Sequence, residues 1–322
     1  MTLKKIGIPV TDIMMPKLSS YTSRYGEELN RSISESDMVI LSHPYLSPEV
    51  KKYIGNKPYI YEAQDIEYML KKYMLPNNET SEKLLKAVFD IEKECCQNSG
   101  FIMACSKDDK QKLSELYNIP LDKIIIVPNG VDADLVKFTN FESRKANKKK
   151  LGIENEKIVL FMGSWHQPNL EACKYIFKLA EKTPEIKYLL MGSQCLYFRN
   201  KKIPKNVGLL GVLDEDAKQA VLDAVDVALN PMMSGSGTNL KMFEYMAAGI
   251  PVITTEFGAR GIGEKDFFIL SSINEMDSDI CKALYGHDLD MCKLTNSVRK
   301  YIEENFDWSK IANILIDKIQ QL

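Results

Sequence analysis

The chain of 322 residues is long enough for two globular domains, since a domain usually holds about 100–200 residues. Its 45% hydrophobic and 27% charged residues are typical of a folded protein and exclude extensive disorder. A formal net charge of −2 argues against nucleic acid as the main partner.

The number and spacing of the cysteines, together with the first residues of the chain, bear on the cellular compartment of the protein. The seven cysteines are odd in number and form no Cys-x-x-Cys pair, which favours reduced thiols over a disulfide framework or a metal site. The first residues lack the apolar run of a signal peptide, and no stretch approaches 18 consecutive apolar residues. We therefore expect a cytoplasmic protein, either free or peripheral to the inner face of the membrane.

Short runs of Val, Ile, Leu and aromatic residues alternate with amphipathic segments of helix length, as in parallel sheets wound with helices. In the first half, strands are expected at 6–10, 38–41, 59–61, 101–104 and 124–127. In the second half, they are expected at 158–162, 188–191, 207–210, 225–229, 252–255 and 268–270, with helices at 169–182, 214–224 and 239–248. The pattern predicts an α/β protein with two Rossmann-like domains.

The segment 138–150 is polar, basic and without periodicity, which predicts a linker at 139–150 between domains at 1–138 and 151–299. The lysine run at its end is expected to be solvated. Residues 300–322 have the apolar spacing of a packed helix.

The most informative segment is PMMSGSGTNLKMFEYMAAGIPVITTEFGARGI, residues 231–262. It predicts a strand, a glycine-rich turn, a helix capped by Thr238, and a further strand. The N–H groups at such a helix start favour an anion, and Gly235 and Gly237 let a phosphate approach the backbone closely.

Lys241 and Glu244 lie three residues apart on one face of this helix. A lysine there can meet a phosphate, and a carboxylate can accept hydrogen bonds from ribose hydroxyls. The alternative is an ordinary capped helix whose lysine and glutamate form a solvated pair. The residues alone leave both interpretations open.

This segment resembles the donor-binding signature of the group 1 retaining glycosyltransferases. Other stretches resemble the same family in order and spacing: DMVILSHPYL (37–46), KPYIYEAQDIEYML (57–70), ACSKDD (104–109), IIIVPNGVD (124–132), FMGSWHQPNLEA (161–172) and VGLLGVLDEDAKQAVLDAVDVALNP (207–231). The resemblance implies a GT-B fold, in which two Rossmann-like domains face a cleft and the last helix returns towards the first domain. It further implies a UDP- or GDP-sugar as donor and a glycan, lipid-linked or protein acceptor.

Carried over residue by residue, the resemblance assigns the donor site to the second domain. The residues implied to bind the donor are Gly163, Ser164, Ser236, Gly237, Thr238, Asn239, Lys241, Glu244, Gly258 and Ala259. Lys241 is placed at the diphosphate and Glu244 at the ribose, and both are expected to take part in catalysis together with Gln64.

Two positions depart from the family. Ser236 stands where the first acid of the Glu-x7-Glu motif is usual, and Gln64 stands where a histidine is common. Gln64 can form hydrogen bonds but cannot act as a base. In this family the departing phosphate is thought to take the acceptor proton, so transfer is expected without a metal or cofactor. The Asp288–Asp290 pair has Asp-x-Asp spacing but is interpreted as a helix-end or loop feature.

The first domain looks incomplete, because family members usually begin with two further βα units. Three explanations stay open: a truncated product, a sheet completed by another polypeptide, and loss of the usual acceptor pocket. A small first sheet would leave its edges exposed, so we also expect a homo-oligomer or a partner subunit. Two functions follow: a glycosyltransferase, or a catalytically weak nucleotide-sugar-binding or partner-stabilising subunit.

Overall fold

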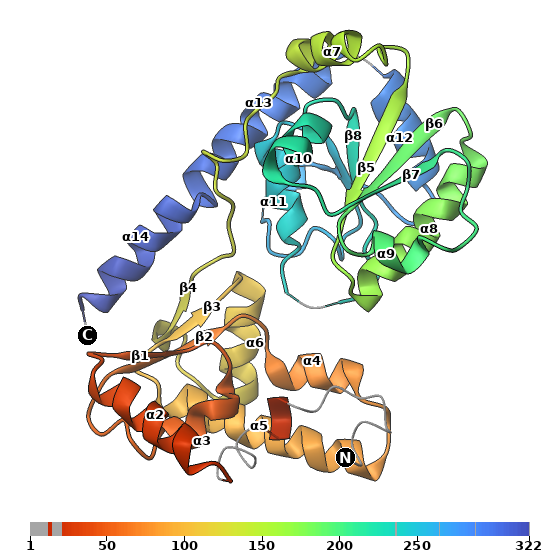
Figure 1. The fold of residues 1–322 in the computed structure, drawn as a ribbon. Helices are drawn as coiled ribbons and strands as arrows, with labels where there is room; N and C mark the ends of the chain where they lie inside the picture. Colours follow the sequence, from red (N-terminus) through yellow and green to blue (C-terminus); the bar gives the residue numbers. More distant parts are fainter. Residues whose placement is uncertain (1–11, 15–20, 236, 264, 287, 322) are drawn as a thin grey trace. The chain divides into compact units, whose positions relative to one another are not determined.

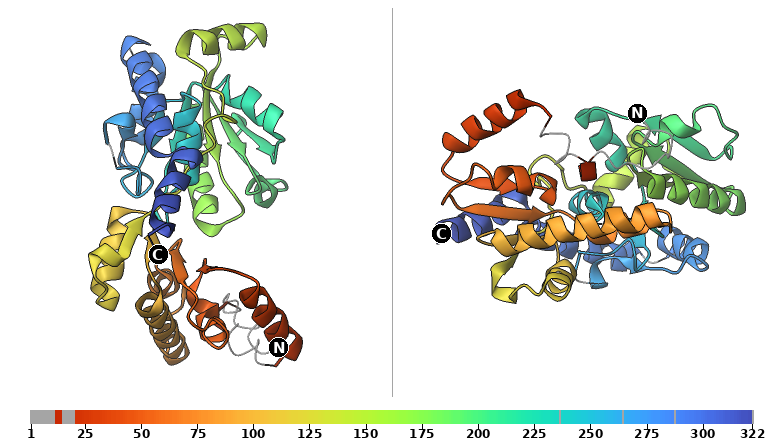
Figure 2. Two further views of the ribbon diagram at one scale, coloured as in Figure 1. Left: turned by 90° about the vertical axis from the view of Figure 1, so that its left-hand side faces the viewer. Right: turned by 90° about the horizontal axis from the view of Figure 1, so that it is seen from below.

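The structure is a computed structural model that describes residues 12–14, 21–235, 237–263, 265–286 and 288–321, with the backbone alone for 288–293. The strand expected at 6–10 lies outside these residues. The chain divides into two compact units, the first being Met1–Pro128 with Leu315–Leu322 and the second Asn129–Ile314 (Figures 1 and 2). Within the described residues, no helix combines the length and apolar character needed to cross a membrane.

The first unit is built on a parallel sheet with the strand order β1-β2-β3-β4 over its described residues. The strands are β1 (Val39–Leu41), β2 (Tyr59–Ala63), β3 (Ile102–Ala104) and β4 (Ile124–Ile126). The other elements of this unit are α2 (Ser23–Ser34), η2 (Pro44–Leu46), α3 (Ser47–Val50), α4 (Glu67–Met74), α5 (Glu79–Asn98), α6 (Lys107–Tyr117) and η3 (Leu121–Lys123). The strands are short and, apart from Glu62 in β2, built of apolar and aromatic residues, as expected where helices cover a parallel sheet.

The second unit has a larger parallel sheet, whose order is β10-β9-β8-β5-β6-β7 over its described residues. The strands are β5 (Lys157–Met162), β6 (Ile186–Met191), β7 (Val207–Gly211), β8 (Val227–Asn230), β9 (Val252–Thr254) and β10 (Ile269–Leu270). The chain runs outward from β5 through β6 to β7, then returns to the other side of β5 as β8. The strand order therefore reverses between β5 and β8.

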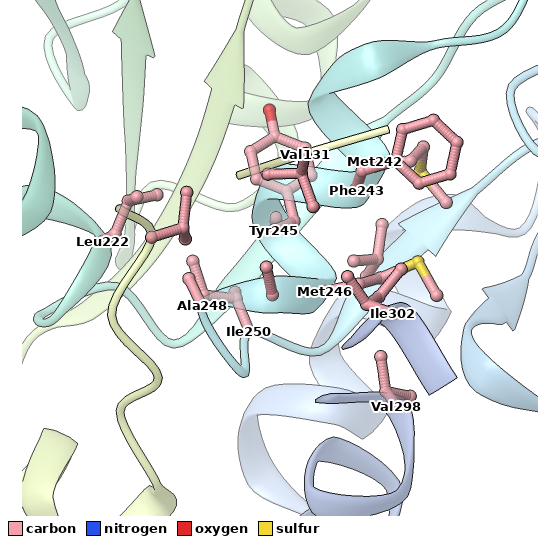
Figure 3. Packing of buried hydrophobic residues seen from close by; sticks show 14 of the residues in the cluster. Val131, Leu222, Met242, Phe243, Tyr245, Met246, Ala248, Ile250, Val298 and Ile302 are labelled. Carbon is pink, nitrogen blue, oxygen red and sulfur yellow. The ribbon is translucent and has the colours of Figure 1, made fainter. Parts of the chain in front are cut away.

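Helices cover both faces of this sheet (Figure 1). The helices that follow β4 in the chain are α7 (Phe141–Lys150), α8 (Gln167–Lys182), α9 (Cys195–Phe198), α10 (Glu215–Leu222), α11 (Leu240–Ala247), η4 (Lys265–Phe267), α12 (Met276–Tyr285), α13 (Asp288–Asn305) and α14 (Trp308–Ile319), and the second half of α14 belongs to the first unit. One buried cluster joins the sheet to α8, α9 and α12, and another joins it to α10, α11 and α13. Figure 3 shows the second cluster, in which Met242, Phe243 and Met246 anchor α11. These contacts pack α11 against one face of the sheet.

These two sheets confirm the predicted α/β class. Every expected strand within the described residues is present, with ends that agree to within two residues. The reason is that buried parallel strands are short, continuous apolar runs bounded by turn residues, and such runs are visible in the sequence.

The segment predicted as a linker forms the helix α7, which is part of the second unit. Its buried residues are charged: Lys148 Nζ lies 2.6 Å from Asp226 Oδ2, and the Arg144 guanidinium donates to backbone carbonyls. A helix buried through charged side chains has no apolar periodicity, which explains why the sequence pattern missed it. The expectation of a solvated lysine run is therefore wrong for Lys148.

The C-terminal region also differs from a single helix at 300–322. The helix α13 ends before Phe306, whose carbonyl accepts a hydrogen bond from Val131 N at 2.9 Å, and α14 begins at Trp308. From Leu315 onward, the second half of α14 belongs to the first unit. There Leu315 and Ile319 pack against a small buried cluster that contains Phe101.

Candidate functional site

A pocket of about 520 Å³ opens at the carboxyl ends of the strands of the second unit. Its lining comes from the loops after β5, β6, β7, β8 and β9 and from α8, α10 and α11. In open parallel sheets ligands bind where the strand order reverses, which here is between β5 and β8. The structure brings together these predicted donor residues at the pocket: Gly163, Ser164, Thr238, Asn239, Lys241 and Glu244.

Glycines allow the strand ends to pack closely at this pocket. Gly163 N donates to Met191 O at 3.0 Å, and Gly192 N donates to Gly211 O at 2.7 Å. A Cβ atom on Gly192, where φ is +122°, would lie 2.0 Å from Gly163 O. A side chain at this position would therefore force the loops after β5 and β6 apart.

Lys241 is the central cation of the pocket. Its ammonium donates to Asn169 Oδ1 at 2.8 Å and lies 4.5 Å from the centre of the Phe161 ring. Among the described residues no carboxylate lies within ion-pair distance of it. Burial lowers the pKa of Lys241 to about 7, so an anion beside the ammonium would restore the charged form.

Asn169 orients this lysine. Its amide Nδ2 donates to Ser164 O at 3.1 Å, which leaves Oδ1 to accept from Lys241 Nζ. The residue is buried at the start of α8, after the turn that contains His166. The sequence placed Ser164 at the donor but missed the role of Asn169, because the lysine that it contacts is 72 residues away.

The turn before α11 lines the pocket with Ser234, Gly235 and Thr238. The N-cap is Asn239 and not Thr238 as predicted; its side chain makes no capping hydrogen bond, and its Nδ2 donates to Gly258 O. Arg260 reaches back with a hydrogen bond of 3.1 Å to Gly237 O, whose residue has φ of +63°. Ser236 lies outside the described residues. The uncapped helix start is compatible with an anion at its N–H groups.

Glu244 does not pair with Lys241. Its Oε2 lies 2.9 Å from Lys218 Nζ on α10, and the side chains are 27% and 21% exposed. No well-aligned hydrogen-bond donor reaches this oxygen within the described part of the chain. Glu244 thus lines the pocket with spare acceptor capacity, held by a lysine that the sequence did not single out.

Two predicted donor contacts take a different role. Gly258 N donates to Thr255 Oγ1 at 2.9 Å and Ala259 N donates to Thr255 O at 3.0 Å. Both N–H groups are therefore already used within their own turn. Gln64 lies in the first unit, exposed directly after β2, whereas the pocket lining comes from the second unit.

Comparison with known proteins finds a glycosyltransferase family that matches the second unit and solved glycosyltransferases with a similar fold. The family Glycosyl transferases group 1 matches residues 156–284, which include all the pocket-lining residues. A putative glycosyltransferase of Bacillus subtilis, YtcC, is 26% identical over 266 residues, covering 75% of this chain and 64% of the relative. An uncharacterized glycosyltransferase of Methanocaldococcus jannaschii is 22% identical over 245 residues, covering 70% of this chain and 61% of the relative. The chain thus spans less than two thirds of the length of these relatives.

Among solved structures, HepE of Anabaena in complex with UDP has a TM-score of 0.74 at 14% identity, covering 93% of this chain and 82% of that one. This likeness shows the fold, which is that of the GT-B glycosyltransferases. The chain is thus similar to the group 1 glycosyltransferases, and the family match lies in its second unit.

Proposed function

We propose that the chain transfers a sugar from a UDP- or GDP-sugar to a glycan, lipid-linked or protein acceptor, with retention of anomeric configuration. The observation that carries the proposal is Lys241, a partly buried cation without a carboxylate partner among the described residues, in a pocket where the strand order reverses. HepE binds UDP and UDP-glucose on the same fold. The negative charge of a nucleoside diphosphate would pair with this buried cation.

In the proposed complex, the diphosphate lies against Lys241 and the uncapped start of α11, while Glu244 accepts hydrogen bonds from the ribose. The bond between the anomeric carbon and the phosphate oxygen breaks, and the phosphate gains negative charge that Lys241 and the helix start stabilise. The acceptor oxygen bonds to the same face of the sugar, and its proton passes to the departing phosphate. Gln64 is proposed to orient the acceptor, since its amide is not a base.

Positive charge from Lys241 and the helix start supports transfer without a bound metal or cofactor. The test is transfer by purified chain with and without EDTA, with NMR of the product to read the anomeric configuration. Retained activity in EDTA and an unchanged anomer are expected. Loss of activity that Mg²⁺ restores would contradict metal independence, and an inverted product would contradict retention.

The second candidate is a catalytically weak nucleotide-sugar-binding or partner-stabilising subunit. The residues that favour it are Ser236 and Gln64, which replace an acid and a histidine usual in the family. Both candidates bind the nucleotide, so both predict that UDP or GDP raises the melting temperature of the chain. A ligand at 100 times its Kd stabilises the folded state by about 2.7 kcal/mol. Transfer by the chain alone supports the enzyme, whereas binding with turnover only after another protein is added supports the subunit.

The Glu244→Gln substitution should weaken ribonucleotide binding about 10- to 100-fold, the equivalent of one hydrogen bond to a charged group. Fold stability should change little, since Glu244 and Lys218 form a partly exposed pair. The sharpest measurement compares UDP with its 2′-deoxy and 3′-deoxy analogues by calorimetry. Wild type should discriminate against at least one of them, and the variant should not. Equal discrimination by both proteins would show that Glu244 does not contact the ribose.

A further inference from the structure

The first unit holds a histidine that is exposed yet firmly positioned. His43 follows β1 at the carboxyl edge of the parallel sheet, and its side chain is 54% exposed. Pro44 follows it as the first residue of η2 and restricts the preceding backbone, which has φ of −148° and ψ of 153°. The direction in which the ring leaves the chain is thereby fixed.

A buried carboxylate holds this ring. Glu67, the first residue of α4, is only 4% exposed, and its Oε1 lies 2.8 Å from His43 Nδ1. Its other oxygen accepts a hydrogen bond of 2.7 Å from the Tyr45 hydroxyl. Burial, with the hydrogen bond to Glu67, raises the pKa of Tyr45, so this hydroxyl stays a donor. The carboxylate therefore accepts Nδ1–H of the ring, which leaves Nε2 as an acceptor in the neutral imidazole.

A second buried acid supports the arrangement from within the core. Glu92 Oε1 accepts from the Glu67 backbone N–H at 3.0 Å and from the Tyr61 hydroxyl at 2.8 Å. Its Oε2 accepts from the Tyr117 hydroxyl at 2.6 Å. Glu67 thus starts α4 at a position tied to the centre of the unit. Such a network preorganises the ring before any ligand arrives.

Gln64 lies at the same edge of the sheet. It follows β2, which pairs in parallel with β1 through Leu41 and Tyr61, and its side chain is also exposed. The carboxyl ends of adjacent parallel strands carry ligand-binding groups in α/β sheets. Two exposed groups that can accept hydrogen bonds from hydroxyls therefore follow neighbouring strands.

We propose that His43, oriented by Glu67, binds a hydroxyl group of the sugar acceptor through Nε2. The inference rests on the proposed function and deepens it, because it names a sugar-hydroxyl site on the first unit. The Tyr45 hydroxyl already satisfies one oxygen of Glu67, and within the part of the chain that the structure describes the exposed Nε2 makes no hydrogen bond. His43 is a binding residue and not a base in this proposal, which is consistent with proton transfer to the departing phosphate.

The test uses the whole chain with methyl α-glucoside and methyl α-mannoside as acceptor probes. His43→Ala should raise the acceptor KM about threefold to tenfold, the effect of one neutral hydrogen bond, while UDP affinity stays unchanged. His43→Gln, whose amide oxygen reaches the place of Nε2, should retain more affinity than His43→Asn, which mimics Nδ1. An unchanged acceptor KM in His43→Ala would overturn the inference.

A second measurement does not depend on turnover. The chain has three histidines, so ¹⁵N spectra of labelled histidine rings can resolve His43. The expected result is the Nδ1–H tautomer and an Nε2 shift on titration with either glycoside. If wild-type chain transfers no sugar to these probes, the proposed function fails for them and the spectra decide alone. A shift at His43 then supports the sugar-hydroxyl site, and its absence overturns it.

Discussion

Replacing Lys241 with alanine is expected to weaken UDP or GDP binding about 10- to 100-fold, the effect of losing a hydrogen bond to a charged group. Binding of the nucleoside alone should change little, since the ammonium faces the phosphates in the proposed complex. Isothermal titration calorimetry with nucleoside, monophosphate and diphosphate measures this difference directly. Lys241→Met is the companion variant, because it keeps the length of the side chain beside Phe161.

The matched control for Lys241 is Lys86→Ala, which removes a lysine whose side chain is 77% exposed in the first unit. It should leave both affinities unchanged. Equal losses for nucleoside and diphosphate in Lys241→Ala would refute the phosphate contact. A drop in melting temperature without any ligand effect would show that the lysine is structural.

The Arg144→Met substitution is expected to destabilise the second unit by about 3–5 kcal/mol, as for other broken buried charge networks. The guanidinium is 3% exposed and donates to five backbone carbonyls, each of which would lose this hydrogen bond: Thr139, Leu222, Val225, Ala248 and Gly249. Burial lowers the pKa of Arg144 only to about 10, so it stays charged at neutral pH.

Urea unfolding followed by tryptophan fluorescence measures this loss, because Trp165 and Trp308 both belong to the second unit. Lys149→Met in the same helix is the control, since Lys149 is exposed, and it should change stability by less than about 0.5 kcal/mol. If Arg144→Met unfolds at the same urea concentration as wild type, the hydrogen bonds of Arg144 contribute little to stability.

The difference between Arg144 and the strands shows what the sequence can predict. Strands such as β5 bury continuous apolar runs, and the helix α11 has an apolar stripe, so both follow from periodicity. The helix α7 buries Arg144 and Lys148 instead, and these charges find partners more than 70 residues away. No local pattern reports such partners, which is why the segment was predicted to be a linker.

In the pocket, too, the sequence predicted the residues that local spacing brings together and missed those that arrive through long-range contacts. Lys241 and Glu244 were identified because they share a helix that follows a glycine-rich turn, and spacing along a helix is local information. Lys218 and Asn169 were missed because they reach the site from α10 and α8 through long-range contacts. For Gly258, the turn was recognised but its N–H group already bonds Thr255. Whether a backbone donor is free depends on the folded turn and not on its composition.

The proposed pairing of Lys241 with a diphosphate is tested most directly by the protons that binding takes up. Burial holds the pKa of the free Lys241 at about 7, so at pH 8 most of these side chains are neutral. A diphosphate raises that pKa, and binding should then take up close to one proton and weaken as the pH rises above 7. Calorimetry of UDP or GDP binding at pH 8, in two buffers with different ionisation enthalpies, gives the number. Uptake near one proton in wild type and near zero in Lys241→Met is the predicted result, whereas binding without proton uptake in wild type would contradict it.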